Sequence, residues 1–350
     1  MIATIRPFEL PLAYPLGTAR GTIDTREGFL FDVFDDPLGL GEASPLAPFT
    51  EDRTDCHDAL QRAADAYTET GWIDAFRAVS GTEEGRLRVP AARHAVSLAY
   101  LDWRARKEYV PLYRHLGGMD GSGTVPVNAT IGDHDAEETA DLATDAAADG
   151  YAAVKVKVGN RPIGEDVERA RAVRDTVGDD VAVRLDANGA WTFEQARTFI
   201  ERTADLALDY LEQPLDPDEF EAHSRLRDRG VDIALDESVA MYSLEDVLAA
   251  DAADVFVLKP MAVGGVDVAR GIAIDLRQSG YRVIVSTTID SVVARTGAVH
   301  LAASLPDVAP SGLATGEFFE SDLAPDPAPV SGGEISLPDV PGLGIEEVDV

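Results

Sequence analysis

The sequence predicts an α/β protein, a (β/α)8-type barrel preceded by a smaller α+β domain. Three observations support this prediction. After about residue 123, short apolar segments alternate with longer amphipathic ones. Eight of the short segments follow one another at intervals of about 23–30 residues, which fits the βα units of a barrel better than an open doubly wound sheet. Before residue 120 strand-like segments come first and helical spacing follows.

The N-terminal domain is expected to hold a small antiparallel sheet followed by helices. Alternating apolar residues predict strands at Ile2–Leu10 and Phe29–Phe34, with a turn signal at Asp36-Pro37. From Asp52 to about Leu116 the apolar spacing becomes helical. This change of period within 120 residues is what favours a mixed α+β domain.

The barrel strands are expected where the short apolar segments occur. They are Val125–Ile131, Ala152–Val158, Val181–Leu185, Leu206–Leu211, Val231–Leu235, Val255–Leu258, Arg282–Ser286 and Gly312–Thr315. Sequences that resemble capping boxes mark three of the following helix starts: Asp135-x-x-Glu138, Thr192-x-x-Gln195 and Ser243-x-x-Asp246. The expected domain boundaries are 1–120, 121–322 and 323–350. The last segment is rich in Pro, Gly and short apolar pairs from about Pro325, so it is not expected to form another βα unit, and we expect it to pack back on the N-terminal domain.

Composition and charge limit which partners the protein can bind and which cellular compartment suits it. The 63 acidic and 30 basic side chains give a net charge of −33, and this field repels nucleic acid and anionic membrane surfaces. Four of the basic residues are lysine, and an acidic, lysine-poor surface indicates a halophilic rather than a mesophilic acidic protein. The single cysteine, Cys56, excludes an internal disulfide, and no apolar stretch approaches the roughly 18 residues of a membrane helix. We expect a cytoplasmic protein without a secretory signal, whose oligomeric state the sequence leaves open.

Three consecutive predicted strands are followed by carboxylates. The motifs are Asp186-Ala187-Asn188, Glu212-Gln213-Pro214 and Asp236-Glu237-Ser238. In a barrel the carboxyl ends of the strands form one rim, where active sites lie, so these acids would converge there. They would repel one another unless a cation neutralised them, and an all-oxygen ligand set suits Mg²⁺ or Mn²⁺ rather than zinc. The alternative is that they are helix N-caps, where Asp and Asn are favoured.

Three of the four lysines lie on the same rim, Lys155 and Lys157 on the second predicted strand and Lys259 after the sixth. Lysine, unlike arginine, can release its proton once positive neighbours lower its pKa. The period of two in a strand puts Lys155 and Lys157 on one face, where each is expected to lower the pKa of the other. The alternative is that both are solvated residues of an exposed strand. A divalent metal flanked by lysines predicts proton abstraction beside a carboxylate, through a metal-stabilised enediolate.

These motifs resemble the muconate-cycloisomerase branch of the enolase superfamily, and within it the o-succinylbenzoate synthases of menaquinone biosynthesis. The matching segments are Gly41-Glu42-Ala43-Ser44-Pro45-Leu46, Pro111-Leu112-Tyr113-Arg114-His115-Leu116-Gly117-Gly118, Lys155-x-Lys157, Asp186-x-Asn188, Glu212-Gln213-Pro214, Asp236-Glu237-Ser238 and Lys259-Pro260. The resemblance covers nearly the whole chain. It implies a modified TIM barrel of the (β/α)7β type with an N-terminal α+β capping domain.

The resemblance also implies a role for each side chain of the rim. The implied metal ligands are Asp186, Glu212 and Asp236, supported from a second layer by Asn188 and Glu237. The metal would be Mg²⁺, with Mn²⁺ as a substitute. Lys157 would take the α-proton of 2-succinyl-6-hydroxy-2,4-cyclohexadiene-1-carboxylate and then, as the acid, help the hydroxyl group to leave from the same face. Lys259 would stay cationic and stabilise the enediolate, while Lys155 would hold down the pKa of Lys157 and contact the carboxylate.

Contacts to a small-molecule carboxylate substrate are implied for a capping-domain loop and for the last two strand ends. The residues are Arg20 in the loop 16–21, Ser286, Thr287 and Thr288 after the seventh strand, and Leu313 and Thr315 at the eighth. Their hydroxyl and backbone N–H groups suit a succinyl carboxylate. Dipeptide epimerases of the branch resemble this chain too, but they have an Asp-x-Asp motif at the eighth strand, where this chain has Gly312-Leu313-Ala314. N-Acylamino acid racemisation needs the same two lysines and is an alternative, as is muconate lactonisation.

Two other classes of function stay open at this stage. A lysine on a barrel strand can form a Schiff base with a carbonyl substrate, as in class I aldolases. A barrel without activity can serve as a binding protein, although the three lysines retained on the rim disfavour that function.

Overall fold

The computed structural model describes residues 2–18, 21–118 and 123–349. Its N-terminal part is an antiparallel sheet of β1 (Ile2–Thr18), β2 (Gly21–Phe34) and β3 (Gly39–Ala43), in that order. The first two strands are longer than the predicted ones, and β3 adds an edge strand where the sequence indicated none. Gly41 makes this edge possible, because a Cβ at that position would collide with the carbonyl of Ala95 on the helix packed against it.

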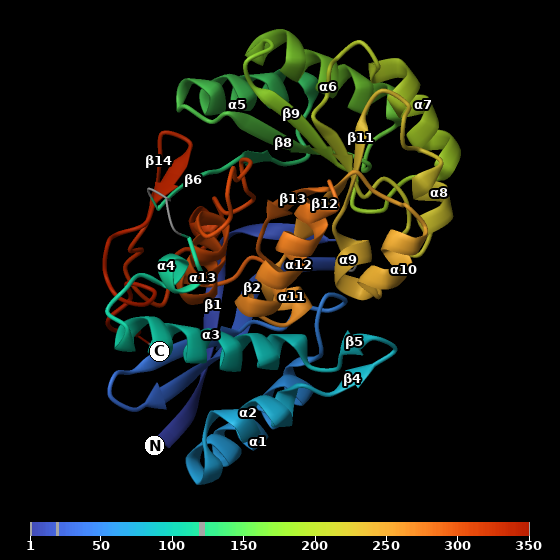
Figure 1. Cartoon of the computed structure of the whole chain (residues 1–350). Helices are drawn as coiled ribbons and strands as arrows, with labels where there is room; N and C mark the ends of the chain where they lie inside the picture. The colour runs from blue at the N-terminus through green and yellow to red at the C-terminus, as the bar shows by residue number, and fades with distance from the viewer. Residues whose placement is uncertain (1, 19–20, 119–122, 350) are drawn as a thin grey trace.

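Helices follow this sheet in the chain. They are α1 (Arg53–Thr70), α2 (Trp72–Val79), α3 (Pro90–Lys107) and α4 (Leu112–His115), with a short hairpin of β4 (Thr82–Glu83) and β5 (Arg86–Leu87) between α2 and α3. α1 begins where the side chain of Asp52 accepts hydrogen bonds from the backbone N–H groups of Thr54 and Asp55. α3 is buried along most of its length and runs below two barrel helices, α11 (Pro260–Val263) and α12 (Val266–Gln278) (Figure 1).

Seven parallel strands form the curled sheet of the barrel within the described residues. They are β7 (Ala129–Ile131), β8 (Ala153–Lys157), β9 (Ala182–Asp186), β10 (Tyr210–Glu212), β11 (Asp232–Leu235), β12 (Val255–Leu258) and β13 (Arg282–Val285), adjacent in chain order. The helices that follow them are α5 (Ala136–Ala148), α6 (Ile163–Val177), α7 (Phe193–Thr203), α8 (Phe220–Ser224), α9 (Glu237–Met241), α10 (Leu244–Ala249), α11 (Pro260–Val263), α12 (Val266–Gln278) and α13 (Val292–Ala303). The predicted fold class, an α/β modified TIM barrel with an N-terminal capping domain, is confirmed (Figure 1).

The barrel closes differently from the sequence-based prediction. In place of a strand at Gly312–Thr315, two isolated parallel bridges join Ser286 to Gly312 and Val127 to Ser311. Pro310, just before, has no N–H group to extend this pairing. The gap between β13 and β7 is therefore bridged by two residues rather than by a full strand.

The predicted first strand, Val125–Ile131, is divided in two. Its first part is β6 (Thr124–Pro126), which pairs antiparallel with β15 (Glu334–Ser336), and β15 pairs with β14 (Val330–Ser331). The chain changes direction between β6 and β7 because the N–H of Val127 donates to Gly333 and that of Asn128 donates to Ser311. The C-terminal segment thus forms a hairpin against the entry to the barrel.

Two other local predictions are corrected. The strand expected at Leu206–Leu211 begins only at Tyr210, because Ala207 has a φ of +46°, which is not extended backbone. Ser243 precedes α10, but its side chain makes no capping hydrogen bond. The capping box of Thr192 and Gln195 is complete, and Asp135 caps α5 by accepting from the N–H of Glu138.

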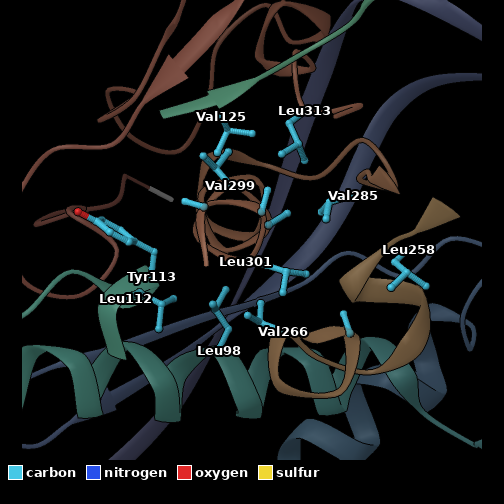
Figure 2. Packing of buried hydrophobic residues seen from close by; sticks show 14 of the residues in the cluster. Leu98, Leu112, Tyr113, Val125, Leu258, Val266, Val285, Val299, Leu301 and Leu313 are labelled. Atoms are coloured by element: carbon cyan, nitrogen blue, oxygen red, sulfur yellow. The ribbon is translucent and has the colours of Figure 1, made fainter. Parts of the chain in front are cut away.

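The largest apolar cluster joins the N-terminal part to the barrel. Leu98 of α3 packs with Val266 of α12 and with Val299 and Leu301 of α13 (Figure 2). The C-terminal segment also reaches α3, since the N–H of Leu343 donates to the buried side chain of Asp102. Among the helices of the described ranges, none combines the length and apolarity needed to cross a membrane.

Candidate active site

The register of the parallel strands places three carboxylates at one level of the barrel. Asp186 ends β9 and is the register partner of Glu212, which ends β10. Asp236 follows β11 directly. All three side chains are buried. The register of the strands thus brings the three carboxylates to one rim of the barrel.

Three lysines reach the same carboxylates. Nζ of Lys155 lies 3.0 Å from Oδ2 of Asp186 and 2.9 Å from Oε1 of Glu212, so it bridges β9 and β10. Nζ of Lys157 lies 2.7 Å from Oδ2 of Asp186. Nζ of Lys259 lies 2.6 Å from Oδ2 of Asp236. The side chains of Lys155 and Lys259 are each 13% exposed and that of Lys157 is 35% exposed, so these residues are not the solvated end of an exposed strand.

Asn188 and Glu237 extend this network. Nζ of Lys157 donates to Oδ1 of Asn188 at 2.8 Å, and Nδ2 of Asn188 donates to Oε1 of Glu237 at 2.9 Å. Asn188 has a φ of +44°, in the left-handed region that Asn tolerates better than most residues. A chain of contacts therefore runs from Lys157 on β8 to the first residue of α9.

Several buried carboxylate oxygens have no partner among the described residues. They are Oε2 of Glu212, Oδ1 of Asp236 and Oε2 of Glu237. A buried anionic oxygen without a hydrogen bond is costly, and a hard divalent cation is the partner that carboxylates of this kind accept. Asp236 also makes no side-chain bond to the helix that follows it, so N-capping does not explain its position.

The three carboxylates of the rim are not arranged as a set of metal ligands. Within the described ranges, no three His, Cys, Asp or Glu side chains stand at metal-binding spacing, and the ammonium groups hold the inner oxygens instead. The donor set fits Mg²⁺ in kind, because it offers oxygen ligands on neighbouring strands with free lone pairs. The oxygens without a partner, Oε2 of Glu212 and Oδ1 of Asp236, are available to such a cation.

Burial and the lysines separate the pKa values of the carboxylates. Burial opposes ionisation of Asp186, but Lys155 and Lys157 outweigh it and hold the pKa of Asp186 well below its ordinary value. Burial and the charge of Asp186 raise the pKa of Glu212 to about 8. Burial and Asp236 likewise raise the pKa of Glu237 to about 7. The pKa of Asp186 therefore lies well below those of Glu212 and Glu237.

The expected mutual lowering of the lysine pKa values is not what dominates at Lys155. Burial lowers the pKa of Lys155, but Asp186 and Glu212 outweigh burial and raise it well above its ordinary value. The pKa of Lys259 is raised in the same way, by Asp236 acting against burial. The carboxylates that Lys155 and Lys259 touch therefore have more effect on these pKa values than a neighbouring ammonium group.

The capping domain supplies residues that the sequence analysis did not single out. The ring of Phe49, in the loop after β3, lies with its centroid 4.4 Å from Nζ of Lys259. Buried Arg26 of β2 donates from Nε to the carbonyl of Ile289, at 3.0 Å. Ile289 has a φ of +61°, a genuine outlier for a β-branched residue, so the loop after β13 is strained and held from the capping domain. No sequence signal marks Phe49 or Arg26, because both act through contacts with distant segments.

The expected substrate-binding residues have different environments. Oγ of Ser286 donates to the carbonyl of Gly312 at 3.2 Å, and the hydroxyl groups of Thr287 and Thr315 are 3.3 Å apart. The hydroxyl group of Thr288 is bonded to Asp290. The side chain of Leu313 is fully buried in the largest apolar cluster, so it is not available to a ligand. Arg20 lies outside the described residues.

A family model described as enolase C-terminal domain-like matches residues 138–349 of the chain. The L-Ala-D/L-Glu epimerase of Bacillus subtilis is 30% identical over 347 residues, covering 96% of this chain and 93% of that protein. The o-succinylbenzoate synthase of Thermobifida fusca is 40% identical over 216 residues, covering 60% of this chain and 65% of that protein. The N-succinyl-L-Arg/Lys racemase of Bacillus cereus is 30% identical over 261 residues, covering 74% of this chain and 70% of that protein.

Solved structures match over nearly the whole chain. A substrate-liganded complex of the Bacillus subtilis epimerase superposes with a TM-score of 0.87 at 28% identity, covering 99% of both chains. A dipeptide epimerase from Enterococcus faecalis, complexed with Mg and the dipeptide L-Leu-L-Tyr, superposes with a TM-score of 0.86 at 25% identity, again over 99% of both chains. The similar proteins thus differ in reaction but share the fold.

Proposed function

The chain belongs to the enolase superfamily, and from that membership we propose that it is an enzyme that inverts the α-carbon of an N-acylated amino acid by moving one proton. The observation that supports this most directly is the placement of two lysines. Lys157 lies on β8 and Lys259 follows β12, and the three strands between them bear the carboxylates. Because the sheet is curled, these lysines approach the carboxylates from opposite flanks, and inversion requires a base on each face.

The proton transfers balance without any other reactant. The neutral amine of one lysine removes the α-proton, and the electron pair of the C–H bond stays on the substrate as an enediolate. The ammonium group of the opposite lysine then donates a proton to the other face of the same carbon. The configuration is inverted, nothing is oxidised or reduced, and the two lysines exchange roles for the other enantiomer.

The remaining rim residues would act on the carboxylate group of the substrate. Asp186, Glu212 and Asp236 would hold Mg²⁺, an assignment supported by the unpartnered oxygens of Glu212 and Asp236. When bound, Mg²⁺ supplies positive charge that stabilises the carboxylate in its enediolate form. Lys155 bridges two of these carboxylates, so its ammonium group adds positive charge at the same place.

Two observations favour an N-acylated amino acid over a dipeptide with a free amine. The chain has Gly312-Leu313-Ala314 where dipeptide epimerases resembling it have two aspartates, so no carboxylate is offered there to an ammonium group. The similar racemase of Bacillus cereus is named for N-succinyl amino acids. Ser286, Thr287 and Thr315 line the adjacent strand ends with hydroxyl groups, which suit an acyl carbonyl or carboxylate.

A second candidate is o-succinylbenzoate synthase, which the 40% identity to the Thermobifida fusca enzyme favours. In that reaction Lys157 would remove the α-proton and then return it to the departing hydroxyl group on the same face. Lys259 would act only as a fixed positive charge. The two candidates therefore differ in whether Lys259 exchanges protons with the substrate.

The deciding experiment follows solvent deuterium into substrate. Each enantiomer of an N-succinyl amino acid is incubated with protein and Mg²⁺ in D2O containing molar KCl, and deuterium at the α-carbon is measured by NMR together with optical rotation. We expect both enantiomers to exchange and to racemise, and we expect Lys157→Ala to abolish racemisation. Conversion of the cyclohexadiene substrate, followed by ultraviolet absorbance, is measured in parallel. Conversion of that compound without exchange of either amino acid enantiomer would exclude the racemase and support the synthase.

A further inference from the structure

A buried ion pair on α6, between Arg169 and Asp166, makes hydrogen bonds to the backbone at and just after Lys157. Arg169 is 1% exposed and Asp166 is fully buried, and Nη1 of Arg169 lies 2.9 Å from Oδ1 of Asp166. A buried ion pair is stable only when its remaining donors and acceptors are satisfied. Most of the groups that satisfy this pair lie at or just after the ends of two barrel strands.

Arg169 donates to both of those strand ends. Its Nη1 donates to the carbonyl oxygen of Lys157 at 2.8 Å, and its Nη2 donates to the carbonyl oxygen of Gly132, just after β7, at 2.8 Å. Its Nε donates to Oγ1 of Thr139 on α5 at 3.3 Å. The planar guanidinium group thus ties Lys157 to the neighbouring strand in a geometry that the compact ammonium group of lysine cannot reproduce.

Asp166 fixes the turn that follows. Its Oδ2 accepts a hydrogen bond from the N–H of Gly159 at 2.9 Å, two residues beyond Lys157. Gly159 has a φ of +101°, and a Cβ there would lie 2.7 Å from Cβ of Ala190 and 3.1 Å from the carbonyl oxygen of Ala187. The turn after β8 is therefore packed directly against the segment after β9 that follows Asp186, the residue to which Nζ of Lys157 is paired.

We propose that Arg169 is a positioning residue that sets the place of Lys157 relative to the substrate. Its described contacts include none of the rim carboxylates, and it would act through the backbone of Lys157. This inference rests on the proposed function, because it assigns Arg169 to one of the two opposed bases. Lys259 contacts Asp236 and Phe49, and neither of these is among the contacts described for Arg169, so the effect of Arg169 is expected on the face of the substrate that Lys157 serves.

The first test compares the two faces. Arg169→Gln and Arg169→Lys are assayed for deuterium exchange with each enantiomer of an N-succinyl amino acid. We expect the enantiomer whose proton faces Lys157 to exchange about ten- to a hundredfold more slowly, the scale of a small misplacement of a catalytic group, while the other keeps the wild-type rate. Equal slowing of both enantiomers would show a general structural role and overturn the inference.

Arg174 gives a matched control on the same helix. Its guanidinium group also donates to backbone carbonyls, those of Leu206, Val181 and Ala207, but at the opposite end of the barrel. Arg174→Gln should leave the ratio of the two exchange rates unchanged. The same change of ratio in Arg174→Gln and Arg169→Gln would contradict a specific link to Lys157.

A second test needs no substrate, so it separates this inference from the proposed function. The chain has four lysines, and labelling with lysine carrying ¹³C at Cε gives four NMR signals that single Lys→Arg variants assign. Arg169→Gln should move the signal of Lys157 and leave those of Lys107 and Lys259 in place, whereas Arg174→Gln should move none of them. If Arg169→Gln does not fold, Arg169→Lys replaces it, because the ammonium group still pairs with Asp166. An unmoved Lys157 signal in a folded variant would exclude the inference, whatever the wild type does with amino acids.

Discussion

The ammonium nitrogen of Lys157 lies 2.7 Å from Oδ2 of Asp186, its register partner on the adjacent strand. The residue proposed as a base is therefore paired with a carboxylate proposed as a metal ligand. A cation held by Asp186 would compete with Lys157 for this oxygen, so metal binding at Asp186 and the position of Lys157 are linked.

Replacing Lys157 tests directly whether it is the base. Lys157→Arg keeps the positive charge beside Asp186, but arginine cannot release a proton at working pH. We expect kcat to fall by about 10²–10⁴-fold, the usual contribution of a general base, with unchanged thermal stability. Lys107→Arg is the control, since Lys107 is exposed and lies over Trp103 of the capping domain. Turnover at the wild-type rate in Lys157→Arg would exclude it as the base.

Metal binding should be visible as stabilisation. A ligand that binds only the folded state at a hundred times its Kd adds about 2.7 kcal/mol. We expect Mg²⁺ to raise the melting temperature of the wild type and a chelator to reverse the rise and abolish activity. Asp236→Asn should lose most of this response. Asp232→Asn, at the other end of the same strand and paired with Arg282, should keep it. A full response in Asp236→Asn would remove Asp236 from the ligand set.

Glu42 of β3 makes stability depend on pH. Its carboxylate accepts hydrogen bonds from Oγ of Ser44, from N and Oγ of Ser291 and from the N–H of Ala294, so it joins the capping domain to the start of α13. Burial and Asp290 raise the pKa of Glu42 to about 7. The folded state therefore binds this proton more tightly than the unfolded chain, whose Glu titrates near its ordinary value of about 4.3. The stability that results is complete below that value and is lost as the pH rises through about 7.

Glu42→Gln removes this titration. The amide presents N–H groups to N–H and O–H donors, so we expect a loss of about 1–3 kcal/mol in the free energy of unfolding at acidic pH. Because the wild type alone loses stability as the pH rises, the difference between the two proteins should shrink between about pH 5 and pH 8. Denaturant melts across this range measure it, with Glu9→Gln on the exposed side of β1 as control. A difference that grows with pH would contradict the assignment.

Much of the fold could be predicted because the apolar periods are strong and local. The strand that bears Asp186 and the strand that precedes Lys259 occur where the sequence indicated, and their ends place the polar residues. The failures depend on pairing between distant segments. The split of Val125–Ile131 is set by Gly333 and Ser311, which lie about 200 residues away and leave no periodic signal. The same reason explains why Phe49 and Arg26 were missed, since each acts across the boundary between the capping domain and the barrel.

The acidic composition leads to a prediction about salt. A net charge of −33 on 350 residues repels itself in the folded state, and dissolved ions screen that repulsion within about 10 Å at 0.1 M. We expect the free energy of unfolding, measured by denaturant titration with urea because it carries no charge, to rise steadily from dilute buffer to molar KCl. An equal concentration of a neutral osmolyte serves as the control for excluded-volume effects. Stability independent of KCl would contradict adaptation to high salt.

The contact between Phe49 and Lys259 makes the two faces of the substrate unequal. An ammonium group over an aromatic ring gains about 0.5–2 kcal/mol, and the ring shields one side of Lys259 from water. Phe49→Leu keeps an apolar side chain but removes the ring. The contact stabilises the ammonium form of Lys259, so its loss favours the neutral amine that removes the proton. We therefore expect a roughly two- to thirtyfold faster exchange of the enantiomer served by Lys259, and Phe49→Tyr, which keeps the ring, should keep the wild-type rate. The enantiomer served by Lys157 should be unaffected. Phe193→Leu, which removes a comparable ring from beside Arg225, controls for the loss of a cation–π contact elsewhere. If Phe49→Leu slowed both enantiomers alike, Phe49 would act on the substrate or on the fold and not through Lys259.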